Sequence, residues 1–353
     1  MSETISHKAR LSGIEAARGV AATAVVLYHV ARHIRKVHDA PLHAGFFQFG
    51  QAGVDLFFVI SGFIIVWVHY GDIGAPAALS RYAERRFTRV MPVYWVALLL
   101  TILLHFAGSH ELPSVGSLFW SASLLPSNHE LILGVAWTLR FELLFYSVVG
   151  VLIWHRAFGL VVLTAWLMLV SSAVAGGIAP HWLPDSVCSG FNLEFFMGMA
   201  VAYCLRHRSV PVPRGIMVAG ILLFAASAAF EDLGWLDGDA VWARFAYGPA
   251  AALIVLGAAE AGRQNLLAVP QWLQSLGSAT FSIYLFQFVW IGLAWKLIVF
   301  AGLDRSLPDI GLFLALAIPG VLGGVLISWI VERPLIRLLR SRPGRTRMPA
   351  PAA

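Results

Sequence analysis

The chain alternates long apolar runs with short polar segments, and this pattern predicts a bundle of membrane-spanning helices. An α-helix needs about 20 predominantly apolar residues to cross a bilayer. Closed β-barrels show a weaker alternation of apolar and polar residues, so we expect an all-α fold. The apolar segment 115–126 is too short to cross and predicts a helix at the membrane surface. The predicted spans number about ten, at 13–31, 50–69, 91–107, 131–155, 158–177, 190–205, 214–230, 242–260, 280–300 and 309–331.

Composition supports a polytopic membrane protein. Of 353 residues, 59% are hydrophobic and only 12% are charged, whereas soluble domains carry about 25% charged residues. We divide the chain into a cytosolic N-terminal segment (1–12), a transmembrane domain (13–338) and a basic, Pro-rich tail (339–353), for which we expect disorder. The net charge of +6 does not indicate nucleic-acid binding, because the basic residues cluster between spans.

The distribution of Lys and Arg predicts the orientation. With the N-terminus in the cytosol, seventeen of the twenty-five basic residues fall in cytosolic segments and five in outer segments. This asymmetry follows the positive-inside rule and places both termini in the cytosol. The outer end of the first span then carries His29, while Arg18 lies nearer the cytosol.

The first span carries charge where lipid would not tolerate it. Arg18 and His29 are eleven residues apart, so they share one helix face and are separated by roughly 16 Å along the axis. Charged groups in a membrane interior are costly, and they usually face a cavity or a partner. We therefore expect a polar interior channel. A purely structural pairing of Arg18 with Glu15 remains the alternative.

Further ionisable residues enter apolar surroundings in other spans. Asp55 lies in the second span, Glu142 in the fourth and Glu194 in the sixth. Asp55 or Glu142 could orient the His29 ring, as a carboxylate orients histidine in a hydrolase triad. Alternatively, these carboxylates form structural ion pairs with Arg18 and with Arg140.

A cluster of arginines precedes the third span. Arg85, Arg86 and Arg89 converge on one face if this segment is helical. Guanidinium groups bind phosphate oxygens well, so the cluster predicts a site for a phosphorylated cytosolic cofactor. The orientation rule alone could also explain it. No His cluster with metal-ligand spacing, nucleophile elbow or phosphate-binding loop occurs, so we expect no metal.

Several blocks of the sequence carry a combined signal that goes beyond single residues. These blocks, in order, are IEAARGVAATAVVLYHV, GVDLFFVISGFII, RFTR, WTLRFELLFY, FFMGMA and VERPL. Together they resemble the membrane-bound acyltransferase-3 family, and the match is nearest to its stand-alone exopolysaccharide O-acetyltransferases (the ExoZ-like branch). Arg18 and His29 resemble the family's Arg-x10-His signature, and Arg86-Phe-Thr-Arg89 resembles its Arg-x-x-Arg. The resemblance covers most of residues 11–338.

The resemblance implies an enzyme that transfers an acyl group, commonly acetyl, from acyl-CoA to a hydroxyl of an extracytoplasmic carbohydrate. It implies a catalytic role for His29 and Arg18, acidic positions at Asp55 and Glu142, and coenzyme A binding by Arg86 and Arg89. The expected location is a bacterial cytoplasmic membrane. A transporter or flippase for a glycan or lipid-linked precursor remains the alternative, as does another membrane O-acyltransferase fold. The sequence does not choose between direct transfer and an acyl-histidine intermediate, and it leaves the acceptor and the oligomeric state open.

Overall fold

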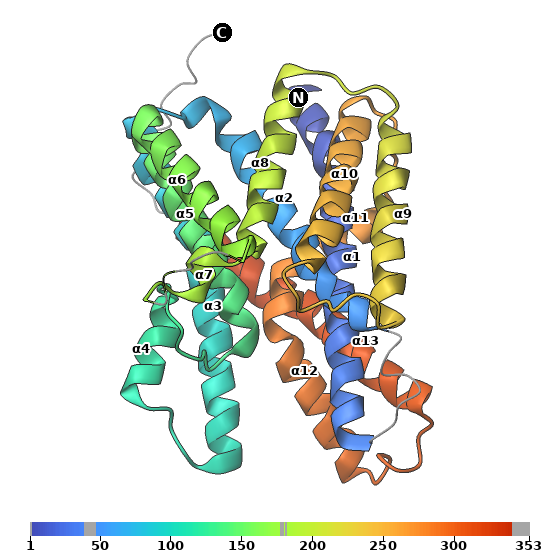
Figure 1. The fold of residues 1–353 in the computed structure, drawn as a ribbon. Coiled ribbons are helices and arrows are strands. Elements are labelled where there is room, and N and C mark those ends of the chain that lie inside the picture. The colour runs from blue at the N-terminus through green and yellow to red at the C-terminus, as the bar shows by residue number, and fades with distance from the viewer. Residues whose placement is uncertain (1, 39–46, 177–179, 181, 341–353) are drawn as a thin grey trace.

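The protein folds as a bundle of helices, and the part of the chain described below contains no strand (Figure 1). The computed structural model describes residues 2–38, 47–176, 180 and 182–340. The helices are α1 (Ser2–His38), α2 (Gly53–His69), α3 (Pro76–Ser109), α4 (Val115–Ser123), α5 (Trp137–Trp154), α6 (Arg156–Val174), α7 (Asp185–Cys188), α8 (Phe191–His207), α9 (Pro213–Asp232), α10 (Ala243–Arg263), α11 (Gln271–Ser278), α12 (Thr280–Phe300), α13 (Asp309–Ile327) and α14 (Arg333–Arg340). Short 3-10 turns precede α2 (Gln48–Ala52), follow it (Tyr70–Asp72) and precede α5 (Gly134–Ala136), and a π-helical turn (Ser328–Glu332) joins α13 to α14.

The predicted all-α membrane fold is confirmed. Among the described residues, nine helical segments are long and apolar enough to cross a bilayer. The remaining predicted span, 190–205, corresponds to α8, which has 17 residues. Segment 115–126 contains the short helix α4, which lies at the edge of the bundle beside α3, at the lower left of Figure 1. Helix α1 begins at Ser2, within the predicted N-terminal segment 1–12. The tail from residue 341 lies outside the described residues.

Helix α3 begins well before the apolar run that predicted it. The run predicted a span from residue 91, but the helix begins at Pro76. Proline is favoured in the first helical turn, where its missing N–H costs no hydrogen bond. The arginines at 85, 86 and 89 therefore lie on a helix, as their predicted convergence on one face required.

Two glycines allow α2 and α8 to cross at very short range. A Cβ atom at Gly198 would lie 2.0 Å from the Val59 carbonyl oxygen, and one at Gly62 would lie 2.1 Å from the Phe195 carbonyl oxygen. Small residues at helix crossings allow backbones to approach closely in membranes. Gly62 of α2 is thus a close-packing site.

We expect Gly198→Ala to destabilise the fold by about 1–3 kcal/mol, because the new methyl group must push α2 away. Gly292→Ala is the matched control, since a Cβ atom at Gly292 on α12 meets no atom within 4 Å. Thermal unfolding of the detergent-solubilised protein, followed by size-exclusion chromatography, measures both. Equal melting temperatures for the two variants would contradict the close crossing.

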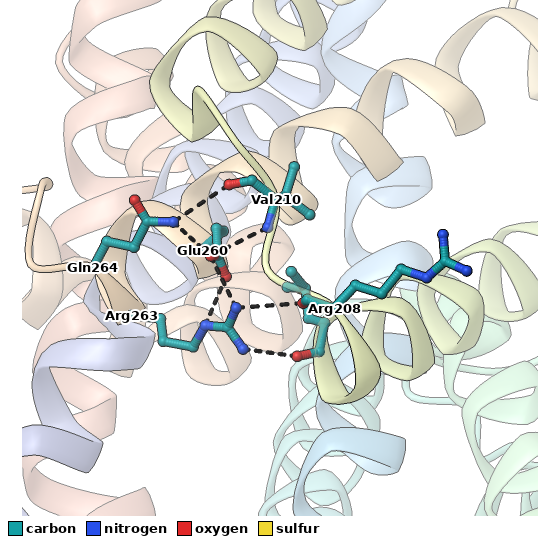
Figure 2. Close-up of polar contacts among 6 residues, drawn as sticks. Arg208, Val210, Glu260, Arg263 and Gln264 are labelled. Carbon is teal, nitrogen blue, oxygen red and sulfur yellow. Dashed lines mark hydrogen bonds and ion pairs between the residues drawn. The ribbon is translucent and has the colours of Figure 1, made fainter.

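A buried carboxylate ties the end of α8 to α10 (Figure 2). Glu260 is fully buried and pairs with Arg263 at 2.7 Å. Arg263 also donates to the carbonyl oxygens of Leu205 (2.8 Å) and Arg208 (3.3 Å), at the C-terminal end of α8. A cation there satisfies carbonyl groups that have no partner within the helix. This network fixes the end of α8, and with it the helix that crosses α2.

Candidate active site

A cavity of about 730 Å³ lies between α1, α2, α3, α5, α12 and α14. It is open to the surface where the exposed side chains of Arg81 and Arg85 line it. Six arginines and two glutamates line it, which leaves four net positive charges if all are ionised. We call it the arginine cavity; its charged lining residues are Arg18, Arg81, Glu84, Arg85, Arg86, Arg89, Glu142 and Arg340.

All three predicted cofactor-binding residues line this cavity. Arg85, Arg86 and Arg89 lie on α3 and all line it. The Arg86 guanidinium lies 5.2 Å from the Tyr146 ring centroid and 5.9 Å from that of Tyr82. Such contacts with aromatic faces favour the cation and restrict its movement. The cluster can therefore hold an anionic ligand at the open end of the cavity.

Two of the predicted catalytic residues also line the cavity. Arg18 reaches it from α1, and Glu142 from α5. Glu142 accepts a hydrogen bond from the Tyr146 hydroxyl, one turn along α5. Arg18 is within electrostatic range of Glu142 and Arg89. Arg18 and Glu142 therefore share one polar cavity.

Aromatic and hydroxyl side chains line the inner end of the cavity, away from the α3 arginines. Tyr284 on α12 donates to the Val135 carbonyl oxygen (2.9 Å) and accepts from the Thr138 hydroxyl (3.0 Å). The Phe57 ring packs edge-on to Tyr284, with centroids 6.2 Å apart. Tyr284, Thr138 and Phe57 all line the cavity. They form its inner wall.

His29 lies beyond that wall and does not line the cavity. Its ring is partly exposed and packs edge-on against Phe288 of α12, with centroids 4.7 Å apart. Phe288 is one helical turn past Tyr284, so His29 lies about one turn beyond the inner end of the cavity. The prediction that Arg18 and His29 face one channel is therefore corrected: Arg18 lines the cavity and His29 does not. The reason is that α12 covers the α1 face at the level of His29, while the same face opens into the cavity at Arg18.

Asp55 is paired elsewhere. Its carboxylate lies 3.1 Å from the Arg244 guanidinium of α10, and both side chains are almost fully buried. Glu194 of α8 is fully buried beside them. Neither Asp55 nor Glu142 makes a hydrogen bond or ion pair with His29 among the described residues. The predicted orientation of His29 by either carboxylate therefore finds no contact. Asp55 does not form the alternative ion pair with Arg18 or Arg140 either, since its partner is Arg244.

Sequence reasoning missed three residues. Arg244 was not recognised as the partner of Asp55, although it is buried on α10. His69 and Tyr284 line the cavity without any motif that marks them. His, Cys, Asp and Glu side chains form no group with metal-binding geometry in the part of the chain that the structure describes.

Comparison with known proteins decides the family. The family model described as an acyltransferase domain (acyltransferase 3) matches residues 11–333. The chain belongs to this acyltransferase family. Its helical bundle is therefore that of a multi-pass membrane acyltransferase, as the sequence motifs predicted, and the family implies an acyl donor as co-substrate.

Two relatives support this assignment. The chain is 32% identical to the exopolysaccharide production protein ExoZ of Rhizobium meliloti (strain 1021), over 86% of this chain and 95% of that protein. It is 26% identical to the acyltransferase MdmB of Streptomyces mycarofaciens, over 97% and 96% of the two chains. No solved structure matches the acyltransferase bundle.

Proposed function

We propose that this acyltransferase moves an acetyl group from acetyl-CoA in the cytosol to a hydroxyl group of a carbohydrate on the outer side of a bacterial cytoplasmic membrane. The observation that carries the proposal is the arginine cavity. Its net positive charge suits the phosphates of coenzyme A, and its volume is within the range of about 300–1,000 Å³ common for ligand pockets. The name of the ExoZ relative supports a polysaccharide acceptor.

The donor binds with its phosphates at the open end of the cavity. Arg85, Arg86 and Arg89 present several N–H donors there, and guanidinium forks match phosphate oxygens. The pantetheine arm extends inward past the apolar walls at Phe57 and Leu139. This brings the thioester towards the inner wall, and opening of the Tyr284–Phe57 contact admits it to His29.

His29 acts as the general base. It takes the proton of the acceptor hydroxyl as the oxygen attacks the thioester carbonyl carbon. The C–S bond then breaks, and the imidazolium returns the proton to the thiolate of coenzyme A. A positioned base contributes about 10²- to 10⁴-fold in rate. Arg18 and Glu142 contact the bound donor, because both line the cavity. Asp55 has a structural role, because it pairs with Arg244.

The proposed topology follows from the charge distribution. The positive-inside rule places the arginine-rich end of the bundle in the cytosol, where acetyl-CoA is present. His29 lies eleven residues further along α1, towards the opposite face. The reaction therefore carries the acyl group across the membrane interior.

Coenzyme A binding tests the donor site directly. We expect the Arg86→Ala, Arg89→Ala double variant to raise the dissociation constant of coenzyme A about 100-fold, because each lost charged hydrogen bond costs more than about 1 kcal/mol. Isothermal titration calorimetry of the purified protein measures it. Arg305→Ala, at an exposed position between α12 and α13, is the control and binds normally. Failure of the unchanged protein to bind coenzyme A would instead favour a transporter.

A further inference from the structure

His69 is a buried histidine of the arginine cavity that the proposed chemistry does not use. It is the last residue of α2, is 4% exposed and lines the cavity. Its ring packs edge-on against Tyr82 of α3, with centroids 4.9 Å apart at an interplanar angle of 89°. The ring is therefore held in one orientation, with both nitrogens directed at polar partners.

The two partners determine which nitrogen carries the proton. Nε2 of His69 lies 2.9 Å from a terminal nitrogen of Arg86, and Nδ1 lies 2.8 Å from an Asp72 carboxylate oxygen. A guanidinium has only donors, so Nε2 must accept. The ring is then neutral with its proton on Nδ1, which donates to Asp72. Asp72 thus fixes the tautomer that can hold Arg86.

From this geometry we infer that His69 is a positioning residue, which holds the Arg86 guanidinium in the cavity ready to bind a phosphate of the donor. The inference rests on the proposed function, because it assigns a phosphate ligand to Arg86. It also states a relation between two side chains that is testable without that ligand. His69 itself contacts no reacting atom.

Arg86 needs such a support. It shares the cavity with Arg85 and Arg89, which repel it, and its Nε is buried without a hydrogen-bond partner among the described residues. An arginine side chain also loses considerable rotamer freedom when it is fixed. A neutral acceptor fixes the guanidinium without cancelling its charge, whereas a carboxylate there would compete with the phosphate. This is why a histidine suits the position.

The first test compares three variants by coenzyme A titration. His69→Phe keeps the ring but loses the acceptor, and we expect about a tenfold weaker affinity. His69→Gln restores an acceptor and is expected to recover most of it. His207→Phe is the matched control, because His207 bonds to Tyr70 at 2.9 Å outside the cavity. Equal losses in the Phe and Gln variants would mean that His69 serves only packing, and would overturn the inference.

The second test does not depend on the donor. Phenylglyoxal modifies free guanidinium groups, and peptide mass spectrometry quantifies the product at Arg86. We expect several-fold faster modification in His69→Phe and a smaller rise in Asp72→Ala, with no change in His69→Gln or His207→Phe. Equal rates in all four variants and the unchanged protein would overturn the inference. If the unchanged protein binds no coenzyme A, the proposed donor fails, and the modification rates still decide whether His69 holds Arg86.

Discussion

His29→Ala is expected to reduce acyl transfer by about 10²- to 10⁴-fold, because the acceptor hydroxyl then has no base to take its proton. The variant is expected to insert and fold normally, since the His29 ring packs at a partly exposed position and makes no hydrogen bond among the described residues. The measurement is the O-acetyl content of cell-surface polysaccharide, by mass spectrometry, in cells that carry each variant in place of the original protein.

His33→Ala is the matched control. His33 lies one turn further along α1, where its ring packs edge-on against Trp295 with centroids 5.1 Å apart. Like His29, it is a histidine of α1 that packs against an aromatic ring of α12, but it lies further from the cavity. We expect near-normal acylation. Full acylation by His29→Ala, or equal losses in both variants, would contradict a chemical role for His29.

Arg244→Ala is expected to destabilise the fold by about 3–5 kcal/mol, because it leaves buried carboxylates without a counter-charge. Asp55 and Glu194 are at most 1% exposed, so water cannot replace the guanidinium. Arg244 also donates to the Gly238 carbonyl oxygen at 2.5 Å and lies 4.2 Å from the Phe191 ring centroid. The yield of monodisperse protein after solubilisation and its melting temperature measure the effect.

Removing the whole cluster separates charge from packing. A triple variant with Asp55→Leu, Glu194→Met and Arg244→Met buries apolar groups of similar size, and such replacements are often neutral or stabilising. We expect it to recover most of the stability that Arg244→Ala loses. Arg305→Ala, at an exposed position, is expected to change nothing. A triple variant as unstable as Arg244→Ala would show that shape, not charge, holds α2, α8 and α10 together.

The sequence predicted those features that depend on local pattern. Apolar runs determine where helices can cross a bilayer, so the spans were found to within a few residues at most ends. The spacing of Arg85, Arg86 and Arg89 predicted a shared face because i, i+3 and i, i+4 neighbours meet on any helix. Arg18 and Glu142 reached one cavity because membrane interiors force charged groups inward.

Features that depend on how helices pack could not be predicted. Arg244 pairs with Asp55, which lies nearly two hundred residues earlier in the chain. The local sequence around either residue does not indicate its partner. The shared face of Arg18 and His29 was correct, but which neighbour covers that face at each level depends on α12. His69 has no motif at all, since its partners come from the following turn and from α3.

In the proposed reaction the acyl group passes from a donor on the arginine-rich face to an acceptor on the opposite face. Membrane vesicles of the two orientations, supplied externally with radiolabelled acetyl-CoA, test this most directly, because the donor does not cross the bilayer. Inside-out vesicles expose the arginine cavity, and we expect that they alone label the polysaccharide. Equal labelling by right-side-out vesicles would contradict it.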